Sequence, residues 1–103
     1  MKPLAGSRLA LFLILTPPLQ AWQTPLTIAG ITAHSGERAT GFLVVPAAAG
    51  DTGTRLPFSI LRGTAAGPTL ALIGGTHGSE VAPIVALQRV AAMVDLAALR
   101  GTL

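Results

Sequence analysis

The sequence predicts an α/β fold, and three features of the chain carry that prediction. Two β-type segments, 41–46 and 55–62, are separated by a glycine-containing turn and together predict a hairpin. A segment that is apolar on both sides of its alternation, 69–73, predicts a central strand covered on both faces. An apolar helical pattern follows over 80–94, so strand and helix form a unit typical of α/β domains.

Composition limits the possible classes of protein. The 103 residues suffice for one small domain, and 50% hydrophobic with 11% charged residues excludes a disordered chain. No cysteine is present, which excludes disulfides and thiolate zinc ligands and leaves the redox compartment open. The formal net charge is +3, but the basic residues are scattered and no basic run with interleaved aromatics occurs. We therefore expect no nucleic-acid partner.

The first 21 residues have the pattern of a secretory signal peptide. Lys2 and Arg8 precede the apolar core 9–15, the prolines of 16–18 end it, and Ala21 is a small residue suited to the position before cleavage. The core is far shorter than the roughly 20 residues that cross a bilayer. The pattern therefore predicts an exported protein, periplasmic or secreted, with mature residues 22–103 and no membrane span after cleavage. A buried strand or an uncleaved anchor is the alternative.

The remaining segments are assigned by turn residues and alternation. We expect a ragged edge segment near 26–31, polar loops at 33–38 and 63–68, and a turn at 47–54 with Asp-Thr-Gly at its tip. Ser79 is the expected N-cap of the helix, and Pro83 falls in its first turn, where proline is tolerated. Asp95 is expected to cap a further turn over 96–100 that Gly101 ends, and a new strand begins at 102–103.

The predicted strand and helix both need neighbours that these segments do not supply. A strand apolar on both faces needs further strands beside it, and a helix that is polar only at Gln88 and Arg89 needs burial on more than one side. We therefore expect residues 22–103 to be the N-terminal part of a larger domain. We also expect the chain alone to be catalytically inactive.

The candidate site lies where the predicted strand meets the predicted helix. His77 and Glu80 stand three residues apart there, among Gly74, Gly75 and Gly78. Catalytic zinc takes nitrogen and oxygen ligands and keeps one position open, and ligands of α/β sheets bind beyond the carboxyl ends of strands. The position therefore indicates His77 and Glu80 as ligands of Zn²⁺. A capping glutamate beside a hydrogen-bonded histidine is the structural alternative.

The same spacing occurs a second time in the chain. His34 and Glu37 are also three residues apart, so the spacing alone does not identify a metal site. No strong strand leads into His34, and the surrounding segment is polar. We interpret His34 and Glu37 as part of a solvated loop.

The stretch from Gly67 to Glu80 resembles a known family, and the likeness continues through Ala82-Pro83-Ile84, Ala86-Leu87-Gln88-Arg89 and Leu99-Arg100-Gly101-Thr102-Leu103. It is similar to the first strand-loop-helix unit of the succinylglutamate desuccinylase/aspartoacylase family, zinc hydrolases of the carboxypeptidase A clan. Leu56-Pro57 and Arg62-Gly63 fit the lead-in of its bacterial members, so the resemblance covers roughly 36–103. It implies the N-terminal part of a zinc-carboxypeptidase-like mixed sheet with flanking helices, preceded by the hairpin.

The resemblance also implies an activity. The family's His-Gly-x-Glu motif matches His77 and Glu80 as zinc ligands, and the implied reaction is hydrolysis of an amide bond in N-acyl amino acids or related small amides. The family's second histidine ligand, its glutamate general base and its substrate-binding arginines lie further downstream. His34 does not match the missing ligand, and Arg89 is not in the arginine motif, so no catalytic residue is assigned.

Two other classes remain open. Gly-Gly-x-His-Gly after a strand also resembles the oxyanion-hole loop of serine α/β-hydrolases, which requires a Gly-x-Ser-x-Gly elbow. Ser79 has Gly78 and Glu80 beside it and does not provide that elbow. The third class is a small exported binding domain in which His77 is structural and the apolar helix contacts a partner. A Rossmann phosphate loop is excluded by the glycine spacing.

Overall fold

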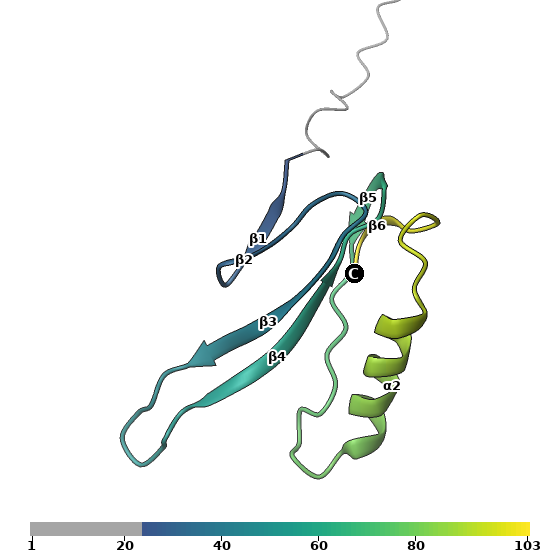
Figure 1. Cartoon of the computed structure of the whole chain (residues 1–103). Helices are drawn as coiled ribbons and strands as arrows, with labels where there is room; N and C mark the ends of the chain where they lie inside the picture. The colour runs from purple at the N-terminus through teal and green to yellow at the C-terminus, as the bar shows by residue number, and fades with distance from the viewer. Residues whose placement is uncertain (1–23) are drawn as a thin grey trace, which may run out of the picture.

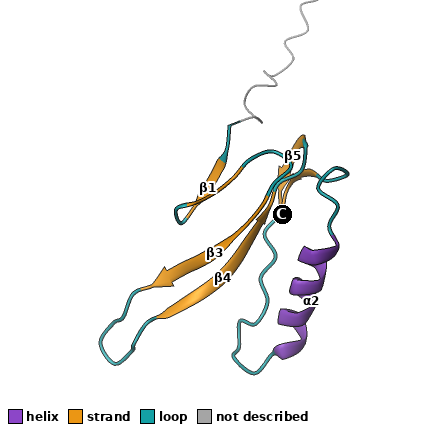
Figure 2. Ribbon diagram, in the orientation of Figure 1, coloured by secondary structure: helices purple, strands orange, loops and turns teal. Residues whose placement is uncertain are grey.

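A computed structural model describes residues 24–103 of the chain (Figure 1). In this part of the chain the structure is mixed α/β, with three two-stranded sheets and one helix (Figure 2). The coarse α/β prediction is confirmed. The predicted signal peptide, 1–21, lies outside the described residues. No helix in 24–103 has the length and apolar character needed to cross a membrane.

The first sheet is a small hairpin. Strand β1, Leu26–Ile28, pairs antiparallel with β2, Ile31–Ala33, where a ragged edge segment was expected. The two residues between them have positive φ, 48° at Ala29 and 79° at Gly30. Positive φ at both central positions is the type I′ turn, whose twist matches that of the strands it joins.

The second sheet is the predicted long hairpin. Strand β3, Arg38–Val45, pairs antiparallel with β4, Thr54–Leu61, in a register that joins Arg38 to Leu61 and Val45 to Thr54. This hairpin prediction is confirmed, and β3 begins three residues earlier than expected. The predicted turn is also present, because the Gly53 amide donates to Asp51 Oδ1 at 2.9 Å, as in an Asx-turn.

The third sheet corrects two predictions. Strand β5, Ala65–Thr69, pairs parallel with β6, Arg100–Thr102, so the expected loop at 63–68 is wrong for 65–68. Of the expected strand 69–73, only Thr69 belongs to β5. The glycines that suggested a loop allow the two strands to approach closely. A Cβ on Gly67 would lie 2.6 Å from the Arg100 carbonyl carbon, and one on Gly101 would lie 2.0 Å from the Pro68 oxygen. The strand predicted to start at 102–103 is present but begins two residues earlier, at Arg100, and ends at Thr102.

The helix α2 runs from Val81 to Met93, within one residue of the prediction at each end. Its N-cap is Glu80, not Ser79, and no side chain of the described residues caps it. No residue of α2 is buried, so the expected burial on more than one side is not observed. Ile73 is 86% exposed, so the segment predicted to be covered on both faces is uncovered here.

The turn that follows α2 is shorter than expected. Asp95 Oδ1 accepts the Ala97 amide at 2.9 Å, which matches its predicted capping role. The turn covers only 96–98, however, because Arg100 and Gly101 already belong to β6. Gly101 therefore does not end a helical turn, and its positive φ of 96° serves the close contact with β5.

The buried residues gather where the sheets meet. Ala33, Ile60, Leu61, Arg62 and Thr102 are each at most 6% exposed. Backbone hydrogen bonds cross this junction in both directions between Leu61 and Leu103, at 2.8 and 2.9 Å. The core is consequently small, and the long hairpin and α2 extend from it with much of their apolar surface exposed (Figure 1).

Candidate metal centre

Two glycines lead the chain from β5 toward the candidate ligands. Gly75 has a φ of 76°, which favours glycine. A Cβ on Gly74 would lie 2.8 Å from Leu87 Cδ1, and one on Gly75 would lie 2.7 Å from Ile84 Cδ1. Side chains of α2 therefore fill the space beside these two glycines. Of Gly74, Gly75 and Gly78, only Gly78 has open space around it.

A tight turn places the two ligand-type side chains at the start of α2. The Glu80 amide donates to the His77 carbonyl at 3.0 Å, and the Val81 amide donates to the Ser79 carbonyl at 3.1 Å. The helix begins at the next residue, Val81. The turn thus brings residues three apart in the sequence onto one side of the helix start.

The side chains of His77 and Glu80 meet across this turn. His77 Nδ1 lies 2.9 Å from Glu80 Oε1, a hydrogen bond in which the imidazole N–H donates to the carboxylate. The His77 side chain is 78% exposed and that of Glu80 is 44% exposed. The pair is therefore accessible to a small ion or molecule from solvent.

The chemistry of this pair fits part of a zinc site. Imidazole nitrogen and carboxylate oxygen bind zinc at about 2.0–2.2 Å in tetrahedral geometry, so two such atoms on one ion lie roughly 3.4 Å apart. His77 Nδ1 and Glu80 Oε1 are 2.9 Å apart across a hydrogen bond, and they would move apart by about half an ångström to hold one ion. Catalytic zinc needs three protein ligands, and residues 24–103 contain no cluster of three or more His, Cys, Asp or Glu side chains. These residues supply two donors and no third.

The second His-x-x-Glu pair makes a different contact. Glu37 Oε2 accepts the backbone amide of His34 at 2.7 Å, and the Glu37 amide donates to the His34 carbonyl at 3.0 Å. Ser35 Oγ donates to the Gly63 carbonyl at 3.3 Å. The Glu37 carboxylate therefore closes a backbone turn, and Ser35 attaches this turn to the chain just after β4. These contacts give the pair a structural role.

Comparison of the chain with protein-family models, with curated proteins and with solved structures found no match.

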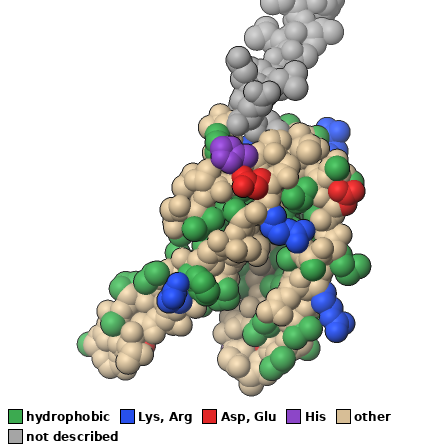
Figure 3. Space-filling view, viewed as in Figure 1, with side chains coloured by type: hydrophobic (Ala, Val, Ile, Leu, Met, Phe, Trp, Pro, Cys, Tyr) green, Lys and Arg blue, Asp and Glu red, His purple; other side chains and the backbone are tan. Residues whose placement is uncertain are grey.

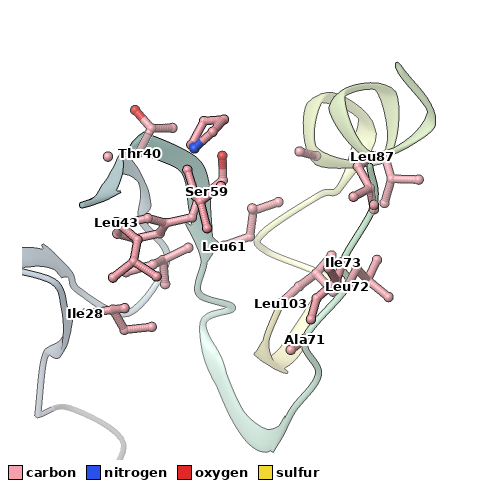
Figure 4. A pocket seen from close by; sticks show the side chains of 18 of the residues that line it. Ile28, Thr40, Leu43, Ser59, Leu61, Ala71, Leu72, Ile73, Leu87 and Leu103 are labelled. Atoms are coloured by element: carbon pink, nitrogen blue, oxygen red, sulfur yellow. The ribbon is translucent and has the colours of Figure 1, made fainter. Parts of the chain in front are cut away.

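An apolar groove is the feature that the sequence did not predict. It lies between the β3–β4 hairpin on one side and 69–76 with α2 on the other, and it measures about 1240 Å³. Figure 4 shows Thr40, Leu43 and Ser59 on one side, and Leu72, Ile73 and Leu87 on the other. The available signal was the apolar character of 69–73 on both faces, which marked the segment as needing cover.

Proposed function

We propose that this chain is part of an exported zinc-dependent hydrolase of amide bonds. Its proposed substrates are N-acyl amino acids or related small amides, cleaved in the periplasm or outside the cell. The proposed architecture is the N-terminal part of a zinc-carboxypeptidase-like domain. One observation carries the proposal: His77 Nδ1 and Glu80 Oε1 lie 2.9 Å apart on an exposed turn between β5 and α2.

The chain's own residues would hold the metal and leave it accessible. His77 and Glu80 would provide one nitrogen and one oxygen ligand, and the hydrogen bond between them holds the two side chains together. For Nδ1 to bind the metal, that hydrogen bond would break and Nδ1 would release its proton. Zinc, when bound, polarises a carbonyl and lowers the pKa of water to about 7. A Cβ placed on Gly78 would meet no heavy atom within 4 Å, so a substrate acyl group has room to approach from that side. Within 24–103 no further histidine or carboxylate joins this pair, so these residues supply no general base beside it.

Zinc titration of the full chain tests the proposal. We expect His77→Ala to weaken zinc affinity by at least about tenfold in isothermal titration calorimetry, because even groups outside the ligand set change metal affinity by 10–100-fold. His34→Ala is the matched control, since His34 has the same spacing to a glutamate but uses its backbone amide. The control should bind zinc as the wild type does.

The titration also separates the proposal from its rival. Equal zinc affinity in wild type and His77→Ala would contradict the metal site and favour a non-catalytic binding domain. Circular dichroism should be unchanged in both variants, because the His77 side chain is 78% exposed and the backbone of His34 is retained. A loss of zinc binding without a loss of fold therefore assigns the effect to the imidazole.

A further inference from the structure

Strand β3 lies at an open edge of its sheet. In the part of the chain that the structure describes, its one hydrogen-bonded neighbour is β4, on the side nearer α2 (Figure 1). The register between the two strands runs without a bulge along the whole of β3. The β1–β2 hairpin contacts β3 near Gly41, where a Cβ would meet the Ile31 side chain. The edge beyond Gly41, at 42–45, has no strand beside it.

Two residues of this edge, Phe42 and Val44, point their backbone groups away from β4. Leu61 exchanges both of its backbone hydrogen bonds with Leu103, so its pair with Arg38 in β3 is not hydrogen-bonded. Hydrogen-bonded and non-hydrogen-bonded pairs alternate in an antiparallel ladder, and Phe42 and Val44 stand an even number of residues beyond Arg38. Their amides and carbonyls therefore offer a short ladder to a further strand.

The open edge has none of the features that usually prevent strand pairing. Natural edge strands are protected by charged residues, prolines or bulges, and residues 39–45 contain no charge and no proline. Phe42 and Val44 on one face are 47% and 65% exposed, and Leu43 on the other face is 48% exposed. Figure 3 shows hydrophobic side chains along the visible face of the hairpin. A strand that pairs here must accordingly be uncharged and apolar on both faces.

The same segment of a second copy meets these requirements. An antiparallel pair about a twofold axis at Leu43 joins Phe42 of each copy to Val44 of the other by reciprocal backbone hydrogen bonds. Leu43 then stands directly opposite its own copy. Arg38 lies at the end of β3 remote from this axis, and Arg55 lies on β4, the outer strand. No like charges therefore face each other across the pair.

We propose that the chain forms a symmetric dimer in which the β3 edges of two copies pair antiparallel about Leu43. The two hairpins then make one four-stranded sheet, with the two β3 strands at its centre and a β4 strand on each side. The pairing brings Phe42 of each copy beside Val44 of the other, and its twofold symmetry limits the assembly to two copies. This proposal does not depend on whether His77 binds zinc.

Charge substitution at the axis tests the dimer, with sedimentation equilibrium of the full chain as the measurement. Leu43→Lys and Leu43→Glu should each raise the dissociation constant of the dimer at least about tenfold, because two like charges replace an apolar contact. An equal mixture of the two variants should restore a dimer, since opposite charges then face each other. Leu43 is half exposed in the single chain, so we expect both variants to keep their circular dichroism spectra.

Leu56→Lys is the matched control for Leu43→Lys. Leu56 pairs with Leu43 on the same face of the hairpin, is also 48% exposed, and lines the same apolar groove. In the proposed sheet it lies three strand spacings, roughly 14 Å, from its own copy, beyond the Debye length of about 8 Å at physiological ionic strength. The control should keep the dissociation constant of the wild type within about twofold.

Each other outcome contradicts the dimer in a different way. A wild type that stays monomeric at every concentration leaves the edge to a different strand and overturns the proposal. Equal weakening by Leu43→Lys and Leu56→Lys assigns the dimer to the apolar groove and also overturns it. A mixture of folded Leu43 variants that stays monomeric excludes Leu43 from the axis, and assemblies larger than two exclude the closed pair.

Discussion

The turns 34–37 and 77–80 both place a histidine three residues before a glutamate, but the glutamate makes a different contact in each turn. In both, the amide of the glutamate donates to the carbonyl of the histidine at 3.0 Å. Glu37 then bonds to the backbone amide of His34, at 2.7 Å, whereas Glu80 bonds to the imidazole of His77, at 2.9 Å. The first carboxylate is used to close the backbone, and the second is paired with a side chain that is exposed to solvent and able to bind other groups.

The order of two residues within the turns explains part of this difference. The first turn reads Ser35-Gly36 at its centre, and the second reads Gly78-Ser79. Gly36 has a φ of 76°, which at the third position of a turn defines type II and favours glycine, while neither Gly78 nor Ser79 has a positive φ. The first turn is also attached to Gly63, and the second leads into α2. The backbone conformation of each turn and the segment to which it is joined decide what the glutamate contacts. The spacing of histidine and glutamate does not.

Exchanging the two central residues within each turn should give the largest difference in stability between the two turns. The double variant Ser35→Gly with Gly36→Ser should lose about 2 kcal/mol of stability, because serine enters a left-handed conformation and the hydroxyl bond to Gly63 is lost. The matched variant Gly78→Ser with Ser79→Gly should change stability by less than about 0.5 kcal/mol. Urea unfolding followed by circular dichroism measures both. Equal losses would show that the two turns are held in the same way.

Removing Glu37 should mainly lower stability, whereas removing Glu80 should mainly lower zinc affinity. Glu37→Ala should cost about 1 kcal/mol, the usual value of a carboxylate that caps a backbone amide, and should leave zinc affinity unchanged. Glu80→Ala should cost less than about 0.5 kcal/mol, because both side chains of its pair are largely exposed.

Zinc affinity supplies the second readout for the glutamate pair. Glu80→Ala should weaken zinc binding by at least about tenfold, which is the effect of even an outer partner of a metal ligand. Thermal unfolding and calorimetry on the two variants complete the comparison. If Glu37→Ala also lost zinc affinity, both pairs would belong to metal sites and the distinction drawn from their contacts would be wrong.

The sequence predicted local elements better than it predicted their pairing. The β3–β4 hairpin and α2 follow from alternation, turn residues and helical spacing, all of which act within one segment. The strand at 65–69 was missed because Gly67 and Pro68 signal a loop when read alone. Their role becomes clear only beside Gly101, more than thirty residues later in the chain, where the absence of side chains permits the close parallel contact.

The candidate site shows the same limit. The meeting of His77 with Glu80 follows from a turn of four residues and was within reach of the sequence. That Glu37 bonds to a backbone amide depends on the positive φ of Gly36 and on the attachment of Ser35 to Gly63. The spacing of the two pairs is equal, so only these surroundings distinguish them.

The residue that follows the first turn offers the smallest and finest test of its structural role. Arg38 Nη2 donates to the carbonyl of Val94, at 3.3 Å, and so links the start of β3 to the C-cap of α2. A cation at the carboxyl end of a helix contributes about 0.3–1 kcal/mol when exposed, so Arg38→Met should cost roughly 0.5 kcal/mol and less in high salt. Arg89→Met, an exposed helix position, is the control and should be neutral. If Arg38→Met is equally neutral at low salt, the first turn is held through its bonds to Arg62, Gly63 and Thr64, and the helix does not share in anchoring it.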